Sequence, residues 1–295
     1  MDYTGQTESP ERARVIAALL SVYILWGSTY LAIRIALESF PPFFMAGFRF
    51  FVTGVLLYLA LRVKGVKNPS WAQWAAGGVV GVLLLAGGNG GVVFAEQWIS
   101  SSFAALGVAT VPLWTVLFAG IWKRWPTRIE WAGIVLGLGG VALLNMEGDM
   151  RAHPAGAAAL IVAAVFWAFG SAWGRNLPLP SGLMAAAVEM ICGGFVFLIM
   201  SLVAGESVPA EPTLRSVAAL FYLMVFGALL GFSAYTYLIN RVRPSLATSY
   251  AYVNPVIAVT IGVLLAGEKV TAAGFAAMLV IVTAVMIVIF GPKRR

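Results

Sequence analysis

Residues 26–34 read WGSTYLAIR and residues 167–175 read WAFGSAWGR, so a tryptophan precedes an arginine by eight positions in both stretches. A second pair follows in the same order: SFAALGVATVP ends at Pro112, and SLATSYAYVNP ends at Pro255. The offset between matching positions is nearly the same for both pairs. The two matches therefore indicate an internal repeat, with one copy in residues 1–148 and the other in residues 149–295.

The composition of the chain indicates what surrounds this repeat. Of its 295 residues, 61% are hydrophobic and only 11% are charged, whereas soluble domains are about 45–50% apolar and about 25% charged. A soluble fold could not keep so much apolar surface out of water. The composition therefore predicts a polytopic membrane protein.

Apolar runs between breaks of charge, proline and glycine predict ten transmembrane helices, because backbone groups in lipid must be hydrogen-bonded within their own segment. The runs are residues 13–33, 43–62, 71–92, 99–122, 127–145, 155–175, 182–203, 214–238, 245–266 and 270–290. Each half then holds five spans. An odd number per repeat places the halves in opposite directions across the bilayer, so we expect an all-α fold of two inverted five-helix repeats. Inverted repeats are typical of secondary transporters, which bind substrate near the midplane.

The positions of the basic residues predict the orientation. Ten spans place both termini on one side, and most of the 19 Lys and Arg residues fall on that side. Cytoplasmic loops collect Lys and Arg, so we expect both termini to be cytoplasmic. The same bias accounts for the net charge of +7 without a nucleic-acid partner.

Several short motifs resemble a known family. They are a tryptophan in the first helix of each half (Trp26 and Trp167), Phe-Arg-Phe at residues 48–50, a proline in the fourth helix of each half (Pro112 and Pro255) and Ala-Gly-Glu at residues 266–268. With them the chain resembles the drug/metabolite transporter superfamily and its EamA-type half-domain. The first half departs from the pattern, because Trp125 occupies the position that would correspond to the acidic Glu268 of the second half. The resemblance implies a ten-helix bundle in the bacterial inner membrane that exports a small metabolite, such as an aromatic amino acid, threonine or homoserine.

Polar and aromatic side chains at helical spacing predict the substrate site, because polar groups that face lipid are costly. The expected substrate-binding residues are Trp26, Tyr30, Asn89, Thr110, Trp167, Tyr237, Ser249, Tyr252 and Asn254. Trp26 and Trp167 lie mid-span, where the interfacial aromatic belt does not explain them. Their ring faces suit an aromatic group or an ammonium. Core packing and hydrogen bonding between helices remain the alternative for these residues.

Two further pairs lie inside the predicted spans. Pro112 and Pro255 each remove a backbone hydrogen bond, which indicates either a hinge or a fixed kink. Arg49 and Glu189 are intramembrane charges, for which we consider an ion pair between them and a proton-relay role for Glu189. Such charges are typical of functional sites in membrane proteins.

The residues present argue against other classes of function. The chain has one histidine, His153, and one cysteine, Cys192, and it lacks the HExxH and GxSxG motifs of hydrolases. We therefore expect no catalytic residue, no metal and no cofactor. The leading hypothesis is an alternating-access exporter of amino acids, with the lipid bilayer and a small molecule as its partners. A carrier of another metabolite or drug and an intramembrane enzyme are the alternatives, and monomer and dimer both remain open.

Overall fold

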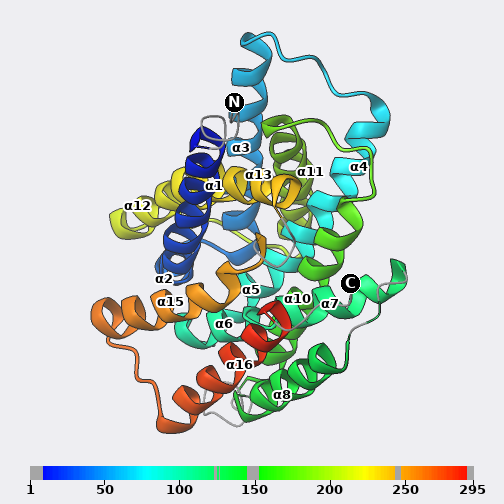
Figure 1. Cartoon of the computed structure of the whole chain (residues 1–295). Helices are drawn as coiled ribbons and strands as arrows, with labels where there is room; N and C mark the ends of the chain where they lie inside the picture. The colour runs from blue at the N-terminus through cyan, green and yellow to red at the C-terminus, as the bar shows by residue number, and fades with distance from the viewer. Residues whose placement is uncertain (1–8, 123–124, 126, 145–152, 243–246, 291–295) are drawn as a thin grey trace, which may run out of the picture.

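The computed structural model describes residues 9–122, 125, 127–144, 153–242 and 247–290. Every regular element within these residues is a helix (Figure 1). The predicted all-α class is therefore confirmed.

The helices of the first half follow the five predicted spans. They are α1 (Ser9–Ser21), η1 (Val22–Trp26) and α2 (Gly27–Ala36) in the first span; α3 (Pro42–Val63); α4 (Trp71–Gly81), η2 (Val82–Asn89) and α5 (Gly90–Ala95); α6 (Ser101–Val108), α7 (Val111–Ala119) and η3 (Gly120–Trp122); and α8 (Arg128–Leu144). Of these, η1 and η2 are π-helical and η3 is a 3-10 turn.

The helices of the second half follow the other five. They are α10 (Pro154–Gly174); α11 (Leu183–Val203); α12 (Leu214–Tyr222), the π-helical η4 (Leu223–Phe232) and α13 (Ser233–Arg241); α15 (Tyr250–Ala266); and α16 (Ala272–Phe290). Among the described residues, six continuous helices are long and apolar enough to cross a membrane, and shorter apolar helices lie in the other four predicted spans.

Local sequence accounts for several helix ends. Ser70 caps α4 by accepting from the backbone nitrogen of Gln73, whose side chain accepts from Ser70 in return. Thr213 caps α12 by accepting from the backbone nitrogen of Ser216, and its own backbone nitrogen donates to Ser39. Gly267 ends α15 with φ of 64°, a left-handed conformation that glycine adopts without steric cost.

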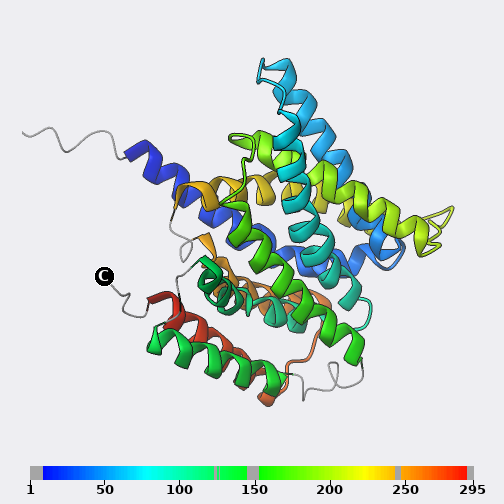
Figure 2. The same ribbon diagram turned by 90° about the vertical axis from the view of Figure 1, so that its right-hand side faces the viewer.

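Equivalent helices of the two halves make equivalent contacts. Helix α3 packs on α11, and α8 packs on α16, so the second and fifth helices of each repeat meet their own counterparts. Helix α2 packs on α15 as α10 packs on α7, and α2 meets α12 as α10 meets η2. Each of these contacts from a helix of the first repeat to a helix of the second is thus matched by the contact between their equivalents, as a two-fold relation between the repeats requires. The start of α1 and the end of α16 lie on the same side of the molecule (Figure 2).

Close backbone approach supports the α3–α11 contact. A Cβ added to Gly194 would lie 2.4 Å from the backbone nitrogen of Phe51, so only glycine fits there. Small residues of this kind allow helices in membranes to pack closely.

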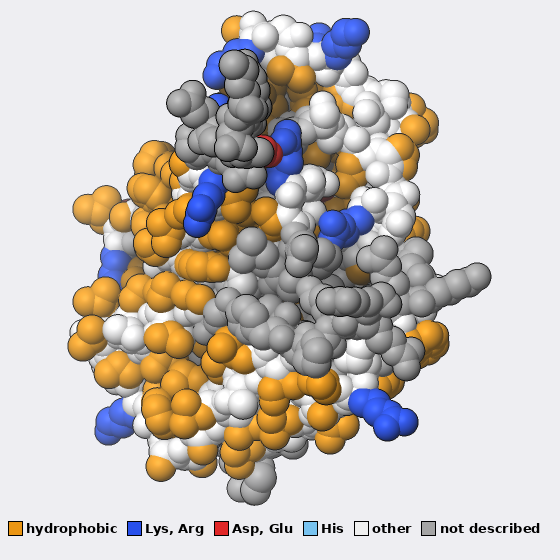
Figure 3. Space-filling model, in the orientation of Figure 1, with side chains coloured by type: hydrophobic (Ala, Val, Ile, Leu, Met, Phe, Trp, Pro, Cys, Tyr) orange, Lys and Arg blue, Asp and Glu red, His pale blue; other side chains and the backbone are white. Residues whose placement is uncertain are grey.

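The outer surface is apolar. Hydrophobic side chains cover much of the face in Figure 3. Over the described residues as a whole, large hydrophobic side chains are exposed, including Leu202 at 80% and Leu264 at 75%. Soluble monomers rarely expose apolar patches of such extent. This surface is suited to lipid, as the composition predicted.

Candidate functional site

A cavity lies between the two halves, with an empty volume of about 650 Å³ that includes any part open to solvent. Its walls come from both repeats. The lining residues are Trp26, Thr29, Tyr30, Ile33, Arg49, Phe50, Leu85, Gly88, Asn89, Val92 and Val108 from the first half, and Ala163, Trp167, Gly227, Phe232 and Tyr250 from the second. Four predicted substrate residues, Trp26, Tyr30, Asn89 and Trp167, are among them.

Four aromatic rings meet at one side of this cavity, and we call them the aromatic cluster (Trp26, Trp167, Tyr235 and Tyr250). The Trp26 ring centroid lies 5.4 Å from that of Trp167, and 5.1 Å from those of both Tyr235 and Tyr250. Two of these three pairs, Trp26–Trp167 and Trp26–Tyr250, are edge-to-face, an arrangement that contributes about 0.5–1.5 kcal/mol beyond area burial. The Tyr235 hydroxyl shares a hydrogen bond with Ser171 at 2.7 Å.

The aromatic cluster separates the cavity from a second, smaller cleft. Trp26, Trp167 and Tyr250 line the cavity, whereas Tyr235 lines the cleft together with Glu189 and Asn240. The cluster combines rings from both repeats.

Trp26 is held by the opposite repeat. Its indole nitrogen donates to the carbonyl oxygen of Gly227 at 3.1 Å, within the π-helical η4. Turns of π-helix disturb the regular backbone ladder and are frequent at functional sites. A Cβ added to Gly231 would lie 2.5 Å from the same indole nitrogen, so glycine makes room for the ring.

Arg49 brings a positive charge to the cavity wall from α3. It is only 3% exposed. Its Nη2 donates to Asn89 Oδ1 at 2.5 Å, and its guanidinium carbon lies 4.3 Å from the centroid of the Phe50 ring. Its Nε and Nη1 are buried without a hydrogen-bond partner.

The ion pair considered between Arg49 and Glu189 does not form among the described residues. Glu189 lines the smaller cleft and Arg49 lines the cavity. The two side chains therefore lie in different spaces, on either side of the aromatic cluster. The depths of Arg49 and Glu189 along their helices differ by about 9 Å, a gap that two long side chains could nearly bridge, but depth carries no information on which way each side chain points.

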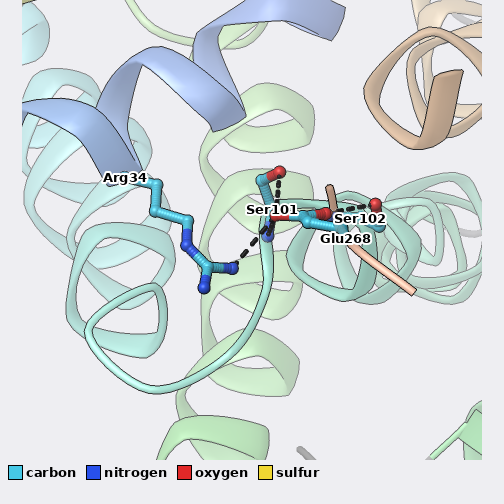
Figure 4. Close-up of polar contacts among 4 residues, drawn as sticks. All are labelled: Arg34, Ser101, Ser102 and Glu268. Atoms are coloured by element: carbon cyan, nitrogen blue, oxygen red, sulfur yellow. Dashed lines mark hydrogen bonds and ion pairs between the residues drawn. The ribbon is translucent and has the colours of Figure 1, made fainter. Parts of the chain in front are cut away.

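A cluster of polar residues, which we call the polar clasp (Arg34, Ser101, Ser102 and Glu268), joins the repeats at another point (Figure 4). The Glu268 carboxylate accepts from the backbone nitrogens of Ser101 and Ser102 at 3.0 and 3.1 Å. It also accepts from their hydroxyls at 2.7 and 2.5 Å. Arg34 Nη1 donates to it at 3.0 Å. A carboxylate is favoured here because the start of α6 carries free N–H groups and a partial positive charge.

These contacts lower the pKa of the Glu268 carboxyl group. Partial burial raises its pKa, but the hydrogen bonds from Ser102 and Ser101 lower it by more, so the net pKa lies below the usual value of 4.5. A carboxylate with a lowered pKa stabilises the folded contact above its ordinary pKa and loses that contribution as pH falls through the lowered value. The clasp is therefore fully formed at neutral pH.

Four other predicted substrate residues are not part of the described lining of the cavity. Thr110 donates to the carbonyl of Gly107 at 2.8 Å, and Ser249 shares a hydrogen bond with Tyr23 at 2.5 Å. Tyr237 lies beside Arg241. Asn254 is buried, and its side-chain nitrogen and oxygen have no hydrogen-bond partner. The side chain of Tyr252 lies outside the described residues.

The two prolines occupy different positions. Pro255 lies inside α15. Pro112 lies in the first turn of α7, after α6 has ended at Val108. Within the predicted span, the helix therefore breaks between α6 and α7, just before Pro112, and this proline occupies a first-turn position, where an N–H would have no acceptor within the helix in any case.

Tyr235, Tyr250 and the clasp serines were missed as site residues, and Glu268 entered the sequence analysis only as a family motif. The available signals were the turn at residues 266–268 and the three consecutive serines at residues 100–102, which are typical of a helix start. Neither signal indicates that Glu268 contacts the serines at residues 101 and 102.

Comparison with known proteins supports this description. The family model described as "EamA-like transporter family" matches residues 13–146 and again residues 154–290. The "Uncharacterized inner membrane transporter YedA" of Escherichia coli (strain K12) is 45% identical over 278 residues, which cover 94% of this chain and 91% of that protein. A "Probable terminal-alkyne amino-acid exporter" of Streptantibioticus cattleyicolor is 24% identical over 260 residues, covering 87% and 86%. A solved crystal structure matches with a TM-score of 0.68 at 21% identity, covering 96% of this chain and 98% of the other, and it shares the fold.

Proposed function

Because this chain belongs to the EamA-like transporter family, we propose that it exports small metabolites, foremost amino acids with aromatic side chains, across the bacterial inner membrane by alternating access. The relatives described above are named as transporters. One distant relative is named as an amino-acid exporter, which supports this substrate class.

One observation carries the proposal: the repeat-equivalent tryptophans, Trp26 and Trp167, meet at a cavity whose walls come from both halves. In transporters with inverted repeats, substrate binds at the seam between repeats, and rocking of one repeat against the other exposes it to each side in turn. The aromatic walls suit an aromatic side chain or an ammonium group.

The aromatic cluster and the polar clasp, which each join the two repeats, are the candidate gates. The polar clasp follows the first, third and ninth spans, which places it on the side opposite to the start of α1. With cytoplasmic termini, as the distribution of basic residues predicts, the clasp faces outward and the aromatic cluster lies nearer the cytoplasm. Export would then load substrate past the aromatic cluster and release it past the clasp.

Reconstitution tests this function. The purified chain in liposomes should give saturable uptake or counterflow of labelled phenylalanine, tryptophan or threonine, and protein-free liposomes should not. The same assay with and without a proton gradient reports the coupling. Folded protein that moves none of these compounds would refute the assignment to amino acids, and a wider panel of metabolites and drugs would then test the alternative cargo.

A further inference from the structure

Arg49 is a buried cation with unused hydrogen-bonding capacity at the cavity wall. Its Nη2 is bonded to Asn89, but Nε and Nη1 have no partner. A guanidinium group has five N–H donors in a fixed fork that matches a carboxylate. Burying a charge without a counter-ion is costly, so this group favours an anionic ligand over an empty cavity.

The charge of the lining limits the charge of that ligand. Arg49 is the only charged residue among the described residues that line the cavity. One positive charge is balanced by one negative charge. A carboxylate meets this condition, whereas a phosphate dianion would bring a second negative charge without a partner.

The rest of the wall indicates the body of the ligand. Trp26, Trp167, Phe50, Phe232 and Tyr250 present aromatic groups, and no acidic residue is present in the described lining to pair with an ammonium. We propose that Arg49 binds the carboxylate of the transported molecule and that an ammonium group is dispensable. This inference rests on the transport function proposed above, and it defines the recognised unit as a monocarboxylate on an aromatic or apolar body.

Glu96 provides the competing explanation. It is close enough to Arg49 for electrostatic coupling, and it is buried with both carboxylate oxygens unpartnered. It does not line the cavity, and the two side chains form no ion pair in the structure. If the role of Arg49 were only to balance Glu96, removing either charge would have the same effect.

Ligand binding to the full-length purified protein, measured by isothermal titration calorimetry, tests the proposal. The probes share one ring: 3-phenylpropionate, phenylalanine, 2-phenylethylamine and phenyl phosphate. The wild-type chain should bind the two carboxylates, and it should bind 2-phenylethylamine and phenyl phosphate at least roughly tenfold more weakly, as expected for loss of a charge-assisted contact. This comparison needs no variant and is independent of folding defects.

Variants then assign the carboxylate contact. Arg49→Gln should weaken binding of 3-phenylpropionate roughly 10- to 100-fold, and Arg49→Lys should restore part of it because the charge remains. Glu96→Gln, the matched control, should retain binding. Equal binding of 2-phenylethylamine and 3-phenylpropionate, stronger binding of phenyl phosphate, no binding of any probe, or equal losses in Arg49→Gln and Glu96→Gln would each overturn the inference.

The two proposals fail differently. Phenylalanine flux in liposomes that is the same for wild type and Arg49→Gln would overturn the role of Arg49 and leave the transport function standing. Arg49-dependent binding without flux would instead refute transport of these compounds.

Discussion

Replacing Glu268 by alanine should open the polar clasp. The substitution removes the acceptor for the backbone nitrogens and hydroxyls of Ser101 and Ser102 and for Arg34. Loss of a capping acceptor costs about 0.5–2 kcal/mol, and a half-exposed ion pair adds up to about 1 kcal/mol. A total of about 2 kcal/mol shifts the ratio of open to closed clasp about 30-fold.

Thiol labelling measures this shift. A reporter cysteine at Val92, a lining residue that is 6% exposed, is introduced into a Cys192→Ser background. A membrane-impermeant maleimide is then added to intact cells. Because labelling is proportional to the open fraction when the clasp is mostly closed, Glu268→Ala should label about 30-fold faster.

A matched control distinguishes opening of the clasp from a general destabilisation of the fold. Glu38 pairs with Arg215 at 3.5 Å, and both side chains are well exposed, so Glu38→Ala should leave the labelling rate nearly unchanged. If folded Glu268→Ala protein labels no faster than the parent, then the clasp does not control access to the cavity.

Four further perturbations have defined outcomes. The labelling rate relative to Glu268→Gln with the same reporter should rise on acidification only below pH 4.5, as Glu268 protonates with its lowered pKa; the ratio cancels the loss of reactive thiolate at low pH, and a rise beginning near neutral pH would contradict the prediction. Gly231→Ala should displace the Trp26 ring, because the added Cβ would lie 2.5 Å from its indole nitrogen, and substrate affinity should fall at least tenfold by calorimetry. Trp167→Ala should reduce aromatic amino-acid flux per folded molecule while Trp167→Phe retains most of it; equal flux in both would argue against a ring contact with substrate, and loss of folded protein instead would support a packing role. Pro255→Ala should change the turnover rate more than the affinity if this proline is a hinge, and unchanged turnover in liposomes would reject that role.

The sequence determined the helices and their order because hydropathy is a property of each segment alone. The run predicted at residues 43–62 is α3, Pro42–Val63, and the run at residues 155–175 is α10, Pro154–Gly174. That Trp26 and Trp167 lie close together could also be inferred from the sequence. Equivalent positions in inverted repeats can meet at the axis that relates them, so the repeat carried three-dimensional information.

Tertiary structure alone decided which faces meet. The stripe spacing that selected Ser249 and Tyr252 holds for a regular helix, but it does not say how that helix is rotated against its neighbours. Tyr250 lines the cavity, whereas Ser249 bonds Tyr23.

The same limit applies to the clasp, where Glu268 meets residues more than 160 positions away. Apolar burial in lipid fixes where a segment lies, while the pairing of a carboxylate with a helix start depends on the relative placement of two segments. That placement is set by the packing of the whole bundle, and no stretch of sequence contains it.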